Sequence, residues 1–392
     1  MRYKKRKDRK GHVLKTGETQ RKDGTYQYSY TNKKGERKFI YAPTLDALRK
    51  KETEIQKSLN MDLDYHEASI TVIVLVERYI KLKDNLRYNS KVNHRFVLNM
   101  LKNDDFGYMK IRNVKVSDAK AFILRLHQKY KRNTLYTIKG VLGPAFQMAF
   151  DDGILYRNPF AFEMKSLDIE DDSDDIKALT KEEQEMFLGF IKNSKTYSKY
   201  YDEIVLLLKT GLRISEFCAI TEKSLDFDKG IIHVDYQLQK EKGGVYVMGP
   251  LKTKSGKREV PMSVEVYDTF FRIVEKRKEQ NIDWVVDGHS GFLFLDKDMK
   301  PKTALHYEKM VQRAKTEFNE THEYQLKIVT PHVFRHTFCT ELAEAGMLPQ
   351  NLQYIMGHAD FGTTMKYYVD KKAETANKAM GEVVPLAMNK MA

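Results

Sequence analysis

The spacing of hydrophobic residues divides the chain into three stretches. In residues 24–30, three tyrosines alternate with polar residues, which is the period of a β-strand with one aromatic face and one polar face. A turn is expected at residues 32–35, and Phe39 and Tyr41 are expected to continue the aromatic face on the returning strand. A helix is predicted from about residue 43 to residue 59. The tyrosines should therefore pack against this helix.

The opposite face of this small sheet is predicted to be polar. It presents Gln27 and Ser29, and basic residues flank the strands: Arg21, Lys22, Lys33 and Lys34. A two- or three-stranded sheet with such a face fits the major groove of DNA. The alternative is that the tyrosines stack on the bases of a single strand. We prefer packing of the tyrosines on the helix, which leaves the polar face for double-stranded DNA.

The second stretch, from residue 69 to about residue 162, is predicted to be helical. Apolar residues recur there at steps of three and four in four places, which predicts a bundle of four helices that ends near Asn158 and Pro159. Six acidic residues follow within residues 168–175. Such a run is typical of a solvated linker, and a metal-binding acidic cluster is the alternative.

The third stretch, from about residue 177 to the end, mixes helices with strands. Residues 231–238, 243–251 and 257–262 are predicted to form a three-stranded antiparallel meander within a mainly helical domain. The expected fold class is therefore multidomain α+β. We expect a DNA-binding sheet and helix over residues 1–64, a four-helix bundle over 69–165, a linker over 166–177 and a catalytic domain over 178–392.

Composition and charge limit the kinds of function. The 392 residues are 41% hydrophobic and 31% charged, with a formal net charge of +14. Most of the excess lies in residues 1–60, as expected of a protein that binds a polyanion, either nucleic acid or an acidic membrane surface. The longest apolar runs, 70–76 and 204–208, are far shorter than the ~20 residues of a membrane-spanning helix. The first ten residues are mostly charged and do not resemble a secretory signal, so we expect an intracellular protein.

The cysteines and the candidate ligands argue against a metal enzyme. Cys218 and Cys339 are far apart and lack the spacing of a zinc site, which fits a reducing compartment. His332 and His336 have the i, i+4 spacing of metal ligands, but Val333 occupies the position where a zinc hydrolase has glutamate. No phosphate-binding loop for ATP is recognisable either.

Four short segments of the third stretch carry side chains that suit a phosphodiester substrate. Two arginines, Arg213 and Arg335, can hold the non-bridging oxygens as negative charge develops on the phosphate. Histidines can hold the phosphate or transfer protons, and a tyrosine hydroxyl can attack phosphorus. A lysine in a hairpin, Lys252 or Lys254, could protonate the leaving sugar oxygen.

These segments resemble the tyrosine recombinase family, which includes the integrases of phages and conjugative transposons. The resemblance is carried by five ordered motifs: FQMAFDDGILYRNPF, TGLRISE, KTKSGKREVP, TPHVFRHTF and MGHADFGTTMKYY. It implies the catalytic residues Arg213, Lys252, His332, Arg335, His358 and Tyr368. It also implies a 3′-phosphotyrosyl intermediate, strand exchange through a Holliday junction, and no requirement for a metal ion or a cofactor.

Two of these assignments keep an alternative. Lys254 could replace Lys252, which is favoured because it precedes Thr253 as in the family hairpin. Tyr367 could replace Tyr368, which is favoured because the dipeptide after it matches the family pattern, although Asp370 stands where histidine is usual.

The first 60 residues resemble the arm-binding domain of conjugative-transposon integrases. This resemblance implies an integration and excision enzyme of a bacterial mobile element, located in the cytoplasm with the nucleoid. The implied partners are double-stranded DNA with core and arm attachment sites, three further copies in a homotetramer on DNA, an excisionase and a host DNA-bending protein, and no membrane. The tail from Lys371 to Ala392 is expected to dock on a neighbouring subunit. A binding-only factor and a type IB topoisomerase are the alternatives in function.

Overall fold

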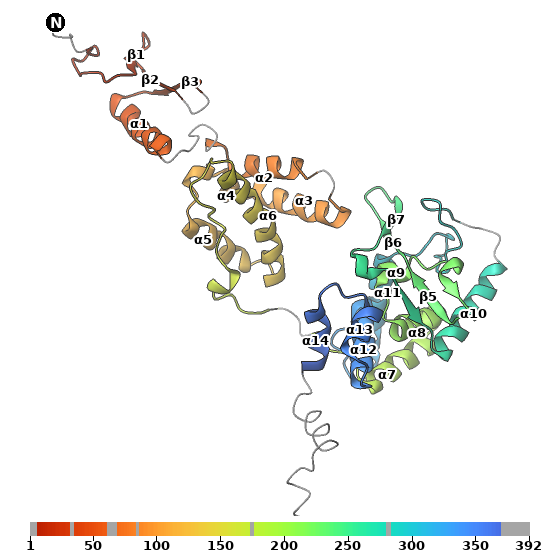
Figure 1. Cartoon of the computed structure of the whole chain (residues 1–392). Helices are drawn as coiled ribbons and strands as arrows, with labels where there is room; N and C mark the ends of the chain where they lie inside the picture. Colours follow the sequence, from red (N-terminus) through yellow and green to blue (C-terminus); the bar gives the residue numbers. More distant parts are fainter. Residues whose placement is uncertain are drawn as a thin grey trace, which may run out of the picture. The chain divides into compact units, whose positions relative to one another are not determined.

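The computed structural model describes residues 6–31, 35–60, 69–83, 86–172, 176–279 and 284–369 (Figure 1). The chain divides into two compact units, Met1–Asp174 and Asp175–Ala392. Residues 32–34 of the turn expected at 32–35, residues 173–175 of the acidic run and the tail from residue 370 lie outside the described residues, so the expectations for them stay predictions. No helix in the described ranges is long and apolar enough to cross a membrane.

The first unit begins with a three-stranded antiparallel sheet covered by a helix. The strands are β1 (Glu18–Gln20), β2 (Tyr26–Thr31) and β3 (Arg37–Ala42), in the order β1-β2-β3, and the helix is α1 (Leu45–Asn60). The tyrosines of β2 are buried together with Leu48 and Ile55 of α1. The predicted packing of the tyrosines on the helix is confirmed.

The prediction for the returning strand is wrong. Phe39 lies opposite Ser29 and Tyr41 lies opposite Gln27 in the β2–β3 register. Directly opposed residues of an antiparallel pair point to the same face, so Phe39 and Tyr41 lie on the exposed face, while Ile40 and Ala42 continue the buried face. A shift of one residue is enough to exchange the two faces of a strand.

The exposed face of this sheet is therefore both aromatic and cationic. The guanidinium of Arg21 lies 5.1 Å from the ring centroid of Tyr41, and that of Arg37 lies 5.6 Å from the ring centroid of Phe39. Such contacts hold a positive charge over an aromatic ring. The face offers apolar surface as well as charge to a ligand.

The rest of the first unit is helical, as predicted. The four predicted helices are α2 (Val72–Lys81), α3 (Tyr88–Lys102), α5 (Val116–His127) and α6 (Arg132–Asp151). A short helix, α4 (Asp105–Tyr108), and two 3-10 turns, η2 (Ile111–Asn113) and η3 (Met164–Ser166), add to them. One turn of helix is too short to give a periodic pattern, which is why α4 was not predicted.

Two residues of the acidic run contact the start of α6. The side chain of Asp172 accepts a hydrogen bond of 2.8 Å from the backbone N–H of Arg132, and Asp171 lies 2.8 Å from the Arg132 guanidinium. Carboxylates are favourable at a helix N-terminus, because the backbone N–H groups there have no partner within the helix. This part of the run therefore anchors α6.

The strands of the second unit differ from the predicted meander. Strands β4 (Leu225–Asp226), β5 (Ile231–Val234) and β8 (Arg258–Pro261) form one antiparallel sheet in the order β4-β5-β8. A separate hairpin is formed by β6 (Tyr236–Lys240) and β7 (Tyr246–Pro250). The predicted first strand is thus divided at Asp235 between two sheets, and the hairpin is inserted between two paired strands.

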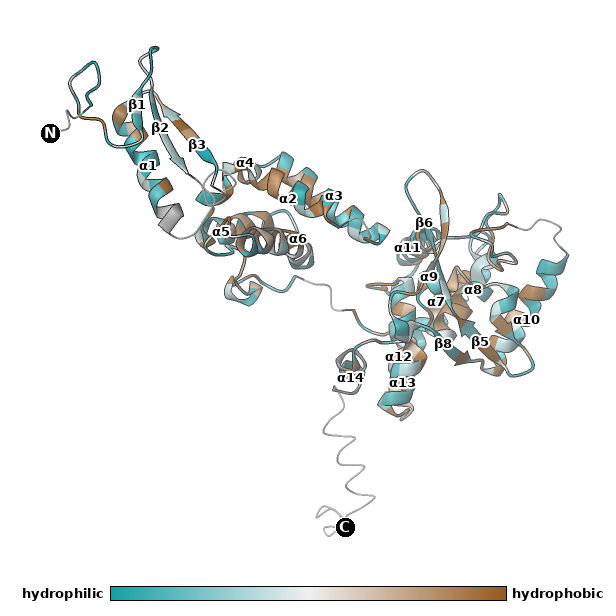
Figure 2. Cartoon of the chain, turned by 45° about the horizontal axis from the view of Figure 1, so that its top comes forward, coloured by the Kyte–Doolittle hydropathy of each residue, from teal (hydrophilic) through white to brown (hydrophobic). Residues whose placement is uncertain are grey.

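The helices of the second unit include α8 (Tyr201–Thr210), whose residues Ile204 to Leu208 are buried. The others are α7 (Lys181–Asn193), α9 (Ile214–Phe217), α10 (Val264–Lys278), α11 (Ala304–Thr321), α12 (Pro331–Glu344), α13 (Pro349–Met356) and α14 (Phe361–Val369). Three 3-10 turns lie between the helices and strands of this unit: η4 (Ser198–Tyr200), η5 (Glu222–Ser224) and η6 (Lys254–Gly256). Figure 2 shows the contrast between the hydrophobic α8 and the hydrophilic stretches of α10 and α13.

Candidate active site

Arg213 is positioned by a glycine that ends α8. Gly211 has a left-handed backbone with φ +61°, and a Cβ at this position would collide with the ring of Phe338 in α12. Only glycine satisfies both conditions without strain. The chain then leaves the helix, and Arg213 becomes the N-cap residue of α9.

Arg335 lies in the second turn of α12. This helix begins at Pro331, and the side chain of Thr330 caps it by accepting a hydrogen bond from the N–H of Val333. Arg335 is only 5% exposed and donates hydrogen bonds to the carbonyl oxygens of Gly211, at 2.6 Å, and of Met356. Burial, and then the charge of Arg213, lower the pKa of Arg335 to about 9, so the guanidinium stays charged at neutral pH.

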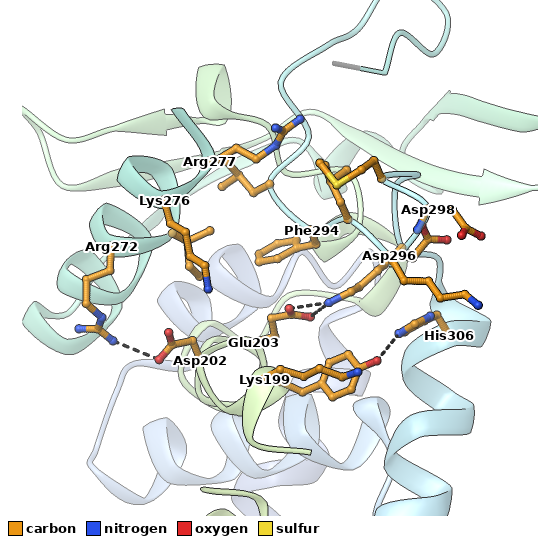
Figure 3. A pocket seen from close by; sticks show the side chains of 17 residues that line it. Lys199, Asp202, Glu203, Arg272, Lys276, Arg277, Phe294, Asp296, Asp298 and His306 are labelled. Atoms are coloured by element: carbon orange, nitrogen blue, oxygen red, sulfur yellow. Dashed lines mark hydrogen bonds and ion pairs between the residues drawn. The ribbon is translucent and has the colours of Figure 1, made fainter. Parts of the chain in front are cut away.

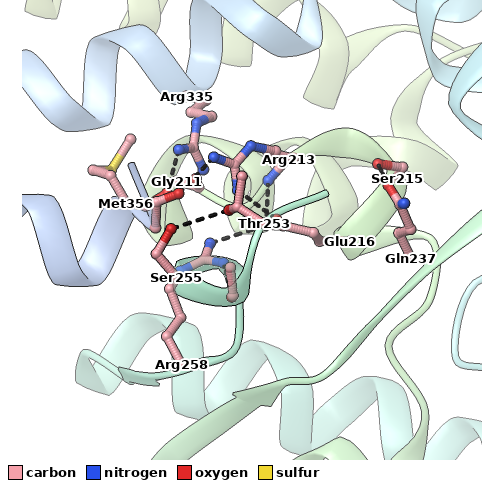
Figure 4. Close-up of polar contacts among 12 residues, drawn as sticks. Gly211, Arg213, Ser215, Glu216, Gln237, Thr253, Ser255, Arg258, Arg335 and Met356 are labelled. Carbon is pink, nitrogen blue, oxygen red and sulfur yellow. Dashed lines mark hydrogen bonds and ion pairs between the residues drawn. The ribbon is translucent and has the colours of Figure 1, made fainter. Parts of the chain in front are cut away.

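The end of α13 is held by three arginines. The helix stops at Gly357, which is left-handed with φ +61°. The consecutive carbonyl oxygens of Ile355, Met356 and Gly357 accept hydrogen bonds from three guanidiniums, those of Arg258, Arg335 and Arg213 respectively. These carbonyls have no partner within the helix, so the arginines supply their missing donors. Figure 4 shows the guanidiniums side by side.

One buried carboxylate lies among the arginines. Glu216 is 2% exposed and accepts hydrogen bonds from Nη1 of Arg213 at 2.7 Å and from Nη2 of Arg258 at 2.9 Å (Figure 4). Burial opposes its ionisation, but the charges of Arg258, Arg213 and Arg335 lower the pKa of Glu216. The cluster thus holds three positive charges and one negative charge.

The two histidines that the resemblance implies lie within reach of this charge. His332 is in the first turn of α12 and keeps contact with solvent. Desolvation, and then Arg335 and Arg213, lower its pKa. His358 is 8% exposed, and its Nδ1 lies 3.0 Å from Oγ1 of Thr364. Burial, and then Arg335, lower the pKa of His358 to about 4, so this ring is neutral at neutral pH.

The two tyrosines of α14 have different surroundings. The ring of Tyr367 stacks parallel to that of His358, with 6.3 Å between centroids, and lies 4.9 Å from the ring of His336. The hydroxyl of Tyr368 donates a hydrogen bond of 2.5 Å to the carbonyl oxygen of Met347. In this conformation Tyr367 therefore lies nearer to the histidines, while the Tyr368 hydroxyl is engaged by the backbone.

Both candidate lysines lie on an exposed loop after β7. Lys252 lies two residues after the end of the strand, and Lys254 begins the 3-10 turn η6. The loop contacts the arginine cluster, because Arg258 donates a hydrogen bond of 2.8 Å to the carbonyl oxygen of Gly256. The structure thus brings Arg213, Arg335, His332 and His358 together, and it places the lysine loop beside them.

Sequence reasoning missed Glu216 and Arg258. Both lie within the motifs that carried the resemblance, TGLRISE and KTKSGKREVP. A charged residue that shares one face of a strand with an apolar residue, as Arg258 does with Val260 two positions later, is a signal for a buried charge that needs a partner. The partner itself cannot be recognised without the fold.

A separate cavity lies elsewhere in the second unit. Its volume is about 740 Å³, and its walls include the first turn of α8, α10 and the start of α11 (Figure 3). Two ion pairs lie in its wall: Lys302 pairs with Glu203 at 2.6 Å, and Arg272 pairs with Asp202 at 3.1 Å. Among the described residues, no group of three or more His, Cys, Asp or Glu side chains is arranged to hold a metal ion.

Known proteins resemble this chain over almost its whole length. Residues 177–374 match the phage integrase family, and residues 2–59 match the DNA binding domain of the Tn916 integrase. The chain is 39% identical over 402 aligned positions to the transposase from transposon Tn916 of Enterococcus faecalis, which covers 98% of both proteins. The transposase from transposon Tn1545 of Streptococcus pneumoniae gives the same identity and coverage.

Solved structures agree with these matches. The Tn1549 transposon integrase in complex with a circular intermediate DNA is 39% identical, with a TM-score of 0.76 over 81% of this chain and 100% of that chain. The λ integrase tetramer bound to a Holliday junction is 15% identical, with a TM-score of 0.53 over 88% of this chain and 96% of that chain, a similarity of fold alone. The chain therefore belongs to the phage integrase family, as a tyrosine recombinase with a DNA-binding domain of the Tn916 integrase type at its start.

Proposed function

We propose that this protein integrates and excises a bacterial mobile element by cutting and rejoining double-stranded DNA through a 3′-phosphotyrosyl intermediate. The observation that carries the proposal is the cluster of Arg213 and Arg335 with His332 and His358, whose net positive charge suits a phosphodiester. The proposed role of the arginines is to bind the two non-bridging oxygens, and that of the histidines is to donate hydrogen bonds to the phosphate.

The proposed chemical step conserves the energy of the phosphodiester bond. The hydroxyl of Tyr368 loses its proton to water, its oxygen forms a bond to phosphorus, and the bond from phosphorus to the 5′ oxygen breaks. Lys252 gives a proton to the leaving 5′ oxygen, and the reverse reaction with a 5′ hydroxyl of another strand rejoins the DNA. Two rounds of exchange pass through a Holliday junction. Before attack, Tyr368 must give up its hydrogen bond to Met347, so its side chain has to move before DNA is cleaved.

The proposed substrates follow from the relatives. The Tn1549 integrase has been solved with circular intermediate DNA and with transposon right end DNA. We assign the same class of DNA to this protein, with core sites bound by the second and third parts of the chain and arm sites bound by the N-terminal sheet. We further propose a homotetramer on DNA, with an excisionase and a host DNA-bending protein as partners at the bacterial nucleoid.

A suicide substrate tests the proposed function. The DNA carries a nick beside the cleavage point of a circular intermediate, so the cut fragment diffuses away and the covalent protein–DNA adduct accumulates. We expect a band of reduced mobility on a denaturing gel. A binding-only protein would give no adduct, and a type IB topoisomerase would relax a supercoiled plasmid that lacks the attachment site.

Lys252→Ala should slow cleavage by roughly a hundredfold, because the leaving oxygen then lacks its proton donor. A substrate with sulfur in place of the bridging 5′ oxygen should restore the rate, since a thiolate leaves without a proton. Lys254→Ala is the matched control on the same exposed loop and should cleave both substrates at the normal rate. Slow cleavage and sulfur rescue in Lys254→Ala, but not in Lys252→Ala, would move the general acid to Lys254.

Removal of residues 1–64 should abolish arm-site binding and leave cleavage at a core site intact. The N-terminal sheet has its own hydrophobic core, and the proposed catalytic residues all lie beyond residue 177. Gel-shift assays with arm DNA and suicide cleavage of core DNA measure the two activities separately. Loss of core cleavage in the shortened protein would contradict the domain boundaries proposed here.

A further inference from the structure

Arg258 is the arginine of the cluster that cannot reach DNA. Its side chain is fully buried, whereas that of Arg213 is 32% exposed. All three of its donor groups are engaged inside the protein: Nε bonds to the carbonyl oxygen of Ile355 at 2.6 Å, Nη1 to that of Gly256 at 2.8 Å, and Nη2 to Glu216 at 2.9 Å. Taking a guanidinium out of water costs free energy, and hydrogen bonds to the protein repay this cost only in part. The burial of Arg258 therefore needs an explanation.

We propose that Arg258 is a positioning residue for the cleavage reaction: it fixes Glu216 and the end of α13, and through them it sets the orientation of the Arg213 guanidinium. The proposal rests on the function proposed above. It adds a residue that touches neither the DNA nor the reacting atoms.

The two anchors of Arg213 explain this role. Nη1 of Arg213 is bound to Oε1 of Glu216, and Nη2 is bound to the carbonyl oxygen of Gly357, both at 2.7 Å. Arg258 holds the other oxygen of the same carboxylate, and it holds the carbonyl of Ile355 two residues before Gly357. Each anchor of Arg213 is thus fixed by a different nitrogen of Arg258.

The same side chain also fixes the lysine loop. Its bond to Gly256 ties the loop of Lys252 to the end of α13. The packing is close, because a Cβ on Gly357 would lie 3.1 Å from both Nη1 of Arg258 and the carbonyl oxygen of Ser255. A planar guanidinium with five donors can bridge three acceptors on three segments, whereas a lysine ammonium cannot do so in this geometry.

The charges around Glu216 predict a change in the pH dependence of cleavage when Arg258 is replaced. The charged groups that face Glu216 are Arg213 on its own helix, Arg258 on β8 and Arg335 on α12. Arg258 is the foremost of the three that keep the pKa of Glu216 low. Without it, we expect Glu216 to take up a proton at higher pH, and a protonated Glu216 no longer holds Nη1 of Arg213 as an ion pair.

The experiment is single-turnover cleavage of the suicide substrate by the full chain, at saturating DNA, from about pH 5.5 to about pH 8.5. Arg258→Met should cleave about a hundredfold more slowly with unchanged DNA affinity, as expected when a reacting group is displaced. Its rate should fall further toward acid pH. The double variant Arg258→Met with Glu216→Gln should be slow but should not show this additional fall.

Two further variants separate positioning from folding. Arg258→Lys keeps the positive charge, so it should cleave slowly but should not lose further cleavage rate toward acid pH. If Arg258→Met does not fold, Arg258→Lys is used in its place. Arg272→Met is the matched control, because Arg272 forms an exposed ion pair with Asp202 outside the cluster; it should cleave normally. Thermal unfolding of each variant shows how much protein is folded.

The outcomes are distinct. Cleavage by Arg258→Met at the rate of Arg272→Met, or a loss explained by the unfolded fraction with an unchanged pH profile, would overturn the positioning role. Failure of the unaltered chain to form any adduct would instead overturn the proposed function.

Discussion

Tyr368→Phe is expected to abolish the covalent protein–DNA adduct and to leave site-specific DNA binding intact. The substitution removes only the attacking oxygen, and without it no bond to phosphorus can form. It also removes the hydrogen bond to Met347, at a cost in stability of about 1 kcal/mol, so the protein should stay folded. A denaturing gel measures the adduct, and a native gel shift measures binding.

Tyr367→Phe is the matched control for this prediction. The ring that stacks on His358 is kept, so only a modest change in cleavage rate is expected. The reverse outcome, an adduct from Tyr368→Phe and none from Tyr367→Phe, would move the nucleophile by one residue. The position of Tyr367 beside His336 and His358 would then be the one from which the tyrosine attacks.

Arg213→Ala should reduce the cleavage rate by several hundredfold. By analogy with the loss of one oxyanion donor, the transition state should lose about 2.7–4 kcal/mol of stabilisation, because negative charge on the phosphate grows as the pentacoordinate state forms. Arg335→Ala should lose at least as much activity. It should also destabilise the fold, since it leaves the buried carbonyls of Gly211 and Met356 without their donors.

Conservative variants sharpen this test. Lysine keeps the positive charge but cannot bind two oxygens as a fork, so Arg213→Lys should recover only part of the lost rate. Single-turnover cleavage and DNA affinity should be measured separately, because a weaker complex would slow cleavage only at low DNA concentration. Normal cleavage by either alanine variant would contradict the proposed phosphate clamp.

The helices and their ends could be predicted because their signals are local. The stripes that predicted α2 and α6, and the glycines that end α8 and α13, act within a few residues of the chain. The strand pairing could not be predicted in the same way. The alternation in β3 fits either face of the sheet, and only the register with β2 places Phe39 outside.

In the proposed site, too, local motifs could be recognised from the sequence, whereas tertiary contacts could not. The motifs identified Arg213 and Arg335 as a pair, although 121 residues separate them in the chain. They did not reveal that Glu216 is buried among three arginines, because the cost and the compensation of a buried charge depend on tertiary contacts. Nor could spacing show that the Tyr368 hydroxyl bonds to Met347.

The excess positive charge of the arginine cluster lowers the stability of the folded second unit. Three guanidiniums are confined with a single carboxylate, and the pKa of Arg335, lowered to about 9, shows that folding works against its charge. The second unit therefore gives up stability that its large hydrophobic core could otherwise provide, in exchange for readiness toward a phosphate. In the proposed function, a bound DNA phosphate would relieve this repulsion and would thereby stabilise the folded protein. Substitutions that neutralise the cluster would be selected if stability alone mattered, and they would be lost wherever recombination is required.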